Sequence, residues 1–120
     1  MKEFQRTERL GTELQRELAG LLRDKVKDPR LGMVTVQEVR VSRDLSHAKV
    51  YFTCMGKDTK ATEKLLNRKL AGFLRHELAH RIRTRIMPQL HFVYDESIER
   101  GEHLADLIEQ AVNIDKEAND

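Results

Sequence analysis

Leucines recur at steps of three and four positions near the start of the chain. Between Leu10 and Val26 the apolar residues fall on one side of a helix, and charged residues fall on the other. This pattern predicts an amphipathic helix over residues 5–27. The segment Asp28-Pro29-Arg30-Leu31-Gly32 follows it, and proline disfavours helical geometry at the residue before it. We therefore expect a turn at this segment.

Two segments with alternating apolar positions come next. Residues 33–42 are rich in valine, and their alternation slips by one position near Gln37-Glu38. This slip predicts a strand with a β-bulge. Residues 46–55 alternate without a slip and predict a half-buried strand. Because only Arg43-Asp44-Leu45 separates the two strands, they should pair as an antiparallel hairpin.

A longer helical pattern runs from Thr59 to Met87, where Pro88 ends it. Gly72 interrupts its middle, and an interior glycine costs about 1 kcal/mol relative to alanine. We expect a kink or a close backbone approach there. The predicted apolar stripe consists of Leu66, Leu70, Phe73, Leu74, Leu78, Ile82 and Ile86.

Two further elements complete the pattern. Residues 90–94 predict a short strand, and the stripe from Leu104 to Val112 predicts a last helix. The order is α-β-β-α-(kink)-α-β-α. It indicates one α+β domain of residues 1–113, with helices packed on one face of a three-stranded sheet, and a polar tail of residues 114–120.

Composition narrows the class of protein. The chain has 120 residues, enough for one domain with one core, and 35% of them are charged. The apolar runs are only a few residues long, so we expect neither a membrane span nor a secretory signal, and a cytoplasmic location.

Charge is distributed unevenly, although the formal net charge is only +2. Six basic residues between Arg68 and Arg85 are opposed by Glu77 alone, whereas residues 95–120 hold nine acidic and two basic residues. Arginines donate in a fixed fork to phosphate oxygens, so the first region suits a nucleic-acid backbone. Two alternatives stay open: a merely solubilising helix face, and a protein-interaction module that uses the acidic last helix.

The segment His76-Glu77-Leu78-Ala79-His80 has the spacing by which a helix presents two histidines and a glutamate to a catalytic zinc ion. A small zinc-dependent hydrolase is therefore an alternative function. Candidates for a third ligand are His91, Glu96, Glu99 and His103. Nearby arginines would disfavour a divalent cation, and both histidines would share the outer face of the helix with Arg83. We favour solvated or RNA-facing histidines and no metal site.

Several short blocks of sequence occur in a distinctive order. They are Lys27-Asp28-Pro29-Arg30-Leu31-Gly32-Met33, Ser42-Arg43-Asp44-Leu45, Ala48-Lys49-Val50-Tyr51, Gly72-Phe73-Leu74-Arg75, and Arg83-Thr84-Arg85-Ile86-Met87-Pro88-Gln89-Leu90 with Phe92-Val93-Tyr94-Asp95. Together they resemble the ribosome-binding factor A family, which has a KH-like domain of type II. The resemblance implies a factor without enzymatic activity or cofactor. Such a factor binds the immature small ribosomal subunit and assists late maturation of its RNA, including adaptation to cold.

The resemblance also implies a binding surface. KH domains hold four nucleotides with a Gly-x-x-Gly loop. This family resembles them but has a helical kink at Ala-x-Gly in place of the loop. The matching residues here are Leu70-Ala71-Gly72, with leucine at the position of the alanine. The expected RNA-binding residues are Arg30, Arg43, Arg68, Lys69, Gly72, Arg75, His76, His80, Arg81, Arg83 and Arg85. The expected partners are the small-subunit precursor and its ribosomal RNA, with no membrane or small-molecule substrate and a monomeric chain off the ribosome. We expect no exposed aromatic side chain for base stacking on this surface.

Overall fold

The computed structural model describes residues 2–26, 28, 30–56, 58–97 and 108. Its elements are α1 (Lys2–Asp24), β1 (Met33–Val41), β2 (His47–Met55), α2 (Thr59–Leu65), η1 (Leu66–Leu70), α3 (Ala71–Arg81) and β3 (Gln89–Tyr94). This order confirms the α+β prediction as far as the third strand. The predicted last helix and the polar tail lie outside the described residues. No helix among those described is long and apolar enough to cross a membrane.

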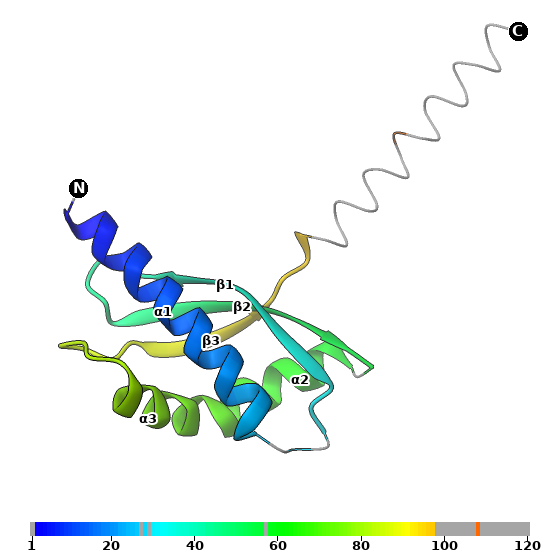
Figure 1. The fold of residues 1–120 in the computed structure, drawn as a ribbon. Helices are drawn as coiled ribbons and strands as arrows, with labels where there is room; N and C mark the ends of the chain where they lie inside the picture. The colour runs from blue at the N-terminus through cyan, green and yellow to red at the C-terminus, as the bar shows by residue number, and fades with distance from the viewer. Residues whose placement is uncertain (1, 27, 29, 57, 98–107, 109–120) are drawn as a thin grey trace, which may run out of the picture.

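The three strands form one sheet in the order β1-β2-β3 (Figure 1). β1 and β2 are antiparallel, and their register shifts between Val36 and Glu38, which confirms the predicted bulge. β3 is parallel to β2 and pairs Leu90 with Ala48. Because parallel neighbours cannot be joined by a tight turn, the chain needs a long crossover. The helix formed by α2, η1 and α3 provides it.

The core lies between the sheet and its helices, on one face of the sheet as predicted. Ala48, Val50 and Phe52 alternate along β2 and are fully buried, whereas Lys49 on the other face is exposed. α1 crosses the sheet, and α3 lies beside α1 on the same face of the sheet (Figure 1). The fully buried leucines of the helices are Leu14, Leu18, Leu21, Leu66, Leu74 and Leu78.

α1 approaches β1 most closely at Gly11. A Cβ atom on Gly11 would lie 2.7 Å from the carbonyl oxygen of Val39, too close for an undisturbed backbone. One turn further along α1, Gln15 Nε2 donates hydrogen bonds to the carbonyl oxygens of Gln37 at 3.1 Å and Val36 at 3.4 Å. These carbonyls lie at the bulge, where the regular ladder is interrupted. The glycine contact and the glutamine together position α1 on β1.

Replacing Gly11 with alanine should lower the free energy of unfolding by about 1–3 kcal/mol, because the added methyl group would push α1 away from the strand. Gly20 on the same helix is a matched control, since a Cβ there would meet only Arg23 Nη2, at 3.8 Å. Gly20→Ala should raise the free energy of unfolding by about 0.5–1 kcal/mol. Urea denaturation measures both effects, and effects of the same sign would contradict the close contact at Gly11.

The second helical region ends earlier than predicted. α3 stops at Arg81, and Ile82 has an extended backbone with φ −117° and ψ 128°. The prediction of a helix to Met87 was therefore wrong, and so was the helical position assigned to Arg83. Ile82 is buried, but Ile86 is 46% exposed, so the apolar stripe ends at Ile82.

The sequence after Ile82 fits two periodicities equally well. Ile82 and Ile86 are four residues apart, as on one face of a helix, but Ile82, Thr84 and Ile86 also alternate with two arginines. The second pattern suits an extended chain. The sheet register decides between them, because Gln89 has to pair with His47 on β2. Residues 83–88 therefore form an irregular connection to β3.

Candidate nucleic-acid interface

The irregularity predicted in the long helix is a π-helical segment. η1 spans Leu66–Leu70 and joins α2 to α3 without interruption. It ends immediately before Ala71-Gly72, so the helix departs from regular α-helical geometry next to the glycine where we expected a kink. A Cβ atom on Gly72 would meet no atom within 4 Å, so the structure has no close backbone approach at this glycine. The surface of the helix is open there.

Polar side chains of this helix close the outer edge of β3. Asn67 Nδ2 donates to the carbonyl oxygen of Phe92 at 2.9 Å, and the Phe92 N–H donates to Asn67 Oδ1 at 2.7 Å. The Tyr94 N–H donates to Glu63 Oε2 at 2.9 Å. A strand edge otherwise exposes a row of unpaired backbone groups. Asn67 lies in η1, so the π-helical turn coincides with the point where the helix is hydrogen-bonded to the sheet.

Arg75 is engaged within the protein. Its Nη2 and Nε donate to the carbonyl oxygen of Met87 at 2.9 and 3.2 Å, and Nε also lies 3.3 Å from the carbonyl oxygen of Pro88. These bonds fasten the connection before β3 to α3. Arg75 remains exposed, so a phosphate contact would use its remaining N–H groups.

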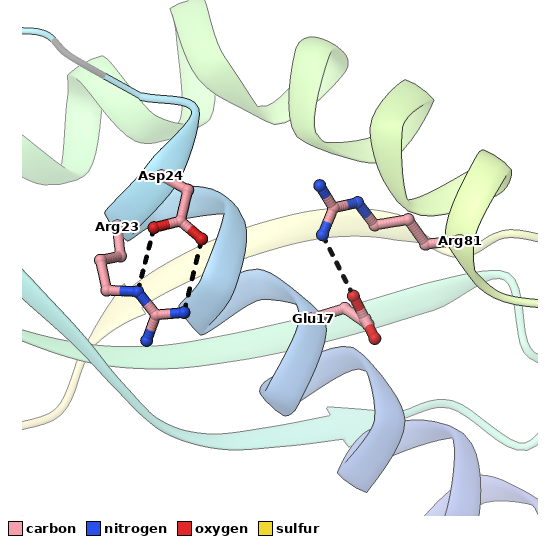
Figure 2. Close-up of polar contacts among 4 residues, drawn as sticks. All are labelled: Glu17, Arg23, Asp24 and Arg81. Atoms are coloured by element: carbon pink, nitrogen blue, oxygen red, sulfur yellow. Dashed lines mark hydrogen bonds and ion pairs between the residues drawn. The ribbon is translucent and has the colours of Figure 1, made fainter.

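Arg81 joins the end of α3 to α1. Its Nη1 lies 3.4 Å from Glu17 Oε2, and the two side chains are 36% and 28% exposed (Figure 2). The nearby Asp24 carboxyl has a lowered pKa, chiefly because the Arg23 guanidinium donates hydrogen bonds to it, with a smaller contribution from the charge of Arg81. Replacing Arg81 would therefore remove this contact between α3 and α1 as well as any RNA contact.

The outer face of η1 and α3 carries the other predicted residues of this helix. We define the outer helix face by Arg68, Lys69, Gly72, Phe73, His76 and His80, all of them exposed. Neither Arg68 nor Lys69 forms an ion pair with another described residue. Nε2 of His76 lies 3.3 Å from Nε2 of His80. This face therefore presents two imidazoles and two cations that have no ion-pair partner in the described part of the chain.

Phe73 also belongs to the outer helix face, contrary to the predicted buried stripe. Its side chain is 42% exposed, while Leu74 is fully buried. Leu74 and Leu78 are buried as predicted, so the buried face of α3 is narrower than the predicted stripe and leaves Phe73 outside it. The expectation that this surface has no exposed aromatic side chain was wrong for the same reason.

The zinc hypothesis depends on a third ligand near the histidine pair. His91 is on β3, where its Nε2 lies 2.9 Å from Nδ1 of His47. Glu99 and His103, two other candidates, lie outside the described residues. In the part of the chain that the structure describes, no three His, Cys, Asp or Glu side chains are grouped so that they could hold a metal ion. Within that part, His76 and His80 therefore have no third side chain beside them that could complete a zinc site.

Arg83 and Arg85 meet the beginning of α1 in a cleft. This arginine cleft has a volume of about 370 Å³ and is lined by Arg6, Arg9, Leu10, Glu13, Leu45, Arg83, Thr84 and Arg85. All four arginines are exposed, and none forms an ion pair with another described residue. Arg6 and Arg9 are not among the residues predicted from the sequence, because they resemble the ordinary polar face of an amphipathic helix. No local signal connects them to the far end of α3.

The hairpin that contributes to the arginine cleft has a strained backbone. Leu45 has a φ of 64°, and this left-handed conformation costs a residue other than glycine about 1–2 kcal/mol. Asp44 Oδ1 accepts hydrogen bonds from Ser42 Oγ at 2.7 Å, Ser46 Oγ at 2.6 Å and the Ser46 N–H at 3.0 Å. These bonds lower the pKa of Asp44 to about 2. They hold the turn that presents the exposed Arg43.

Known proteins resemble this chain over most of its length. The family model described as ribosome-binding factor A matches residues 6–108. The chain belongs to this family. A ribosome-binding factor A from Pseudomonas syringae pv. syringae (strain B728a) is 53% identical over 118 residues, which cover 95% of this chain and 85% of the relative. One from Alkalilimnicola ehrlichii (strain ATCC BAA-1101 / DSM 17681 / MLHE-1) is 50% identical over 122 residues, which cover 99% and 93%.

Solved structures of the ribosome-binding factor A family agree with the fold. The crystal structure of the factor from Thermus thermophilus matches with a TM-score of 0.67 at 33% identity, over 73% of this chain and 94% of that chain. A homology model of the Thermus thermophilus factor, as fitted into the cryo-EM map of a 30S–RbfA complex, matches with a TM-score of 0.64 at 33% identity. That match covers 75% of this chain and 96% of the other.

The residues predicted from resemblance to the ribosome-binding factor A family lie in separate places. Arg83 and Arg85 are in the arginine cleft at the start of α1, whereas Arg30 follows the end of that helix. α1 has 23 residues, so its ends are about 35 Å apart at 1.5 Å per residue. Arg30 Nη2 pairs with Asp28 Oδ2 at 2.7 Å, and this guanidinium lowers the pKa of Asp28 to about 2. Arg30 thus stabilises its own turn.

Replacing Asp44 with alanine should destabilise the hairpin in a pH-dependent way. The folded-state pKa of Asp44 is about 2, below the value of about 4 for an unfolded aspartate. Its stabilisation is therefore present above about pH 4 and is lost as the pH falls towards 2. Thermal unfolding of wild type and Asp44→Ala should give midpoints that differ above pH 4 and converge below it. A difference that stays constant down to pH 2 would contradict the hydrogen bonds of the Asp44 carboxylate.

Proposed function

We propose that this chain is a ribosome assembly factor that binds the immature small ribosomal subunit through its ribosomal RNA. It assists late maturation of that RNA, including during adaptation to cold. It acts in the cytoplasm as a non-enzymatic factor and is monomeric off the ribosome. The observation that carries the proposal is the likeness, with a TM-score of 0.64, to the Thermus thermophilus factor fitted into the map of a 30S–RbfA complex.

The outer helix face has the chemistry that this function requires. Arg68 and Lys69 are exposed and form no ion pair with another described residue, so they are available to phosphate groups. Displacement of counterions by such cations provides most of the affinity for an RNA backbone and makes it dependent on salt. The open surface at Gly72 lets a backbone approach the helix between these cations and the histidines.

Phe73 adds a base contact to these phosphate contacts. It lies four residues after Lys69 and three before His76, so the three side chains are neighbours on the helix surface. An exposed aromatic ring stacks on an unpaired base, whatever its identity. We therefore assign Phe73 a base-stacking role, with His76 and His80 as polar or partly protonated neighbours that support the phosphate contacts.

The other predicted arginines have different roles in this proposal. Arg30, Arg75 and Arg81 serve the fold first, since each already has a protein partner. Arg83 and Arg85 extend the basic surface from α3 towards α1, and Arg43 extends it onto the hairpin. Several separate contacts of this kind suit recognition of a folded RNA by its shape and backbone charge.

Binding to purified small-subunit precursors should weaken when Arg68 and Lys69 are both replaced with glutamine. The slope of log K against log salt should become shallower by about 1–2 units, because a protein that lacks these cations displaces fewer counterions from the RNA when it binds. Sedimentation at several salt concentrations measures this. Arg40→Gln/Lys49→Gln is a charge-matched control on the face of the sheet away from the helices. The two residues lie opposite each other on the neighbouring strands β1 and β2. If wild type does not sediment with the precursors even at low salt, the proposed function is wrong.

Replacing Phe73 with leucine should weaken binding to the same precursors by about 1–3 kcal/mol, because leucine has no π-face for a base. Phe73 is 42% exposed, so the free energy of unfolding should change little. Phe52→Leu is a contrasting variant, since Phe52 is fully buried and its loss should reduce stability instead. Unchanged binding by Phe73→Leu would remove the stacking role from the proposal.

A further inference from the structure

The arginine cleft is built from parts of the chain that the outer helix face does not use. Arg6 and Arg9 come from the beginning of α1, and Arg83 and Arg85 come from the connection before β3. The four arginines are exposed, and we call them the rim of the cleft. Leu10 is buried, and Glu13, Leu45 and Thr84 are half-buried; we call these four residues the floor. The cleft thus has a basic rim and a floor that is mostly apolar but includes one carboxylate.

Two energetic costs coincide at this cleft. Four arginines and one glutamate line the cleft, and like charges around one hollow repel one another. The backbone at Leu45, which lines the same cleft, is held in the left-handed region. Strained residues persist where the surrounding structure enforces them, and they cluster at ligand sites. The strained hairpin is compatible with a ligand site, and the unbalanced positive charge points to an anionic ligand here.

The carboxylate indicates how such a ligand lies. Glu13 makes no hydrogen bond or ion pair with another described residue, and its negative charge repels phosphate from the floor of the cleft. Phosphates are therefore kept at the arginine rim. A carboxylate oxygen accepts hydrogen bonds, and a ribose 2′-hydroxyl group can donate one. The floor therefore suits the sugar of a nucleotide whose phosphates lie on the rim.

We propose that the arginine cleft binds an unpaired segment of RNA. The rim arginines hold consecutive phosphates, and Glu13 accepts a hydrogen bond from a ribose 2′-hydroxyl group. A volume of about 370 Å³ is at the small end of the range for small-molecule sites, so the cleft admits about one nucleotide and not the width of a duplex. The inference rests on the proposed function, because it takes RNA as the partner, and it adds a second contact region.

The first test removes charge from the α1 side of the cleft. Arg6→Gln/Arg9→Gln should bind a labelled 12-nucleotide single-stranded RNA about tenfold more weakly than wild type, with a salt slope about 1–2 units shallower. Both arginines are exposed, so thermal unfolding should not change. Arg16→Gln/Lys25→Gln is the charge-matched control, because both residues are exposed, lie outside the cleft, and form no ion pair with another described residue.

The second test uses Glu13→Ala with RNA and DNA of the same sequence. Loss of a carboxylate that only repels phosphate would strengthen binding to both. If Glu13 also accepts from the 2′-hydroxyl group, binding to RNA should weaken while binding to DNA strengthens, and the preference for RNA should fall about fivefold. A parallel gain for RNA and DNA would overturn the assignment of Glu13.

The outcomes separate this inference from the proposed function. If wild type binds neither small-subunit precursors nor the oligonucleotide, the proposed function itself fails. If wild type binds, and Arg68→Gln/Lys69→Gln weakens binding while Arg6→Gln/Arg9→Gln equals its control, the outer helix face stands and the cleft inference fails. Competition by free adenosine monophosphate as effective as that by unlabelled RNA would show a site for free nucleotides and would also overturn the inference.

Discussion

The outer edge of β3 is closed by hydrogen bonds from the helix that leads to it. Asn67 exchanges two bonds with the Phe92 backbone, Glu63 accepts from Tyr94, and Arg75 holds the carbonyl groups just before the strand. β3 joins the sheet parallel to β2 through this one long crossover, so the same helix both delivers the strand and covers its edge. The rotation of α3 about its axis follows from these bonds. It sends Leu74 and Leu78 into the core and leaves Phe73 and the histidines outside.

Arginines in this chain divide between holding the fold and presenting charge. Arg30, Arg75 and Arg81 each have a carboxylate or carbonyl partner, whereas the rim of the arginine cleft has no such partner among the described residues. The planar fork of arginine suits both roles, because carboxylates and phosphates offer similarly spaced oxygens. A count of basic residues along the sequence therefore overestimates the surface available to RNA near α3. It also underestimates the surface near the start of α1.

The arginine cleft depends on three separate features of the fold. The Gly11 contact and the Gln15 hydrogen bonds position α1 on β1, and the Asp44 carboxylate shapes the hairpin. The early end of α3 brings Arg83 and Arg85 to the same place. None of these features involves a side chain of the four arginines. This arrangement links the packing of the core directly to the chemistry of the surface.

By itself the sequence determined the order of helices and strands as far as β3, the bulge beside Gln37, the antiparallel hairpin and the family. These features depend on local periodicity and on contiguous blocks of residues, which can be recognised without the fold. Only the tertiary structure decided that α3 ends at Arg81, that Phe73 is exposed, and that Arg6 and Arg9 line one cleft with Arg83 and Arg85. The physical reason is that these outcomes depend on the register of β3 against β2 and on the placement of α1. Residues far apart in the chain set both, and they leave no pattern within any single segment.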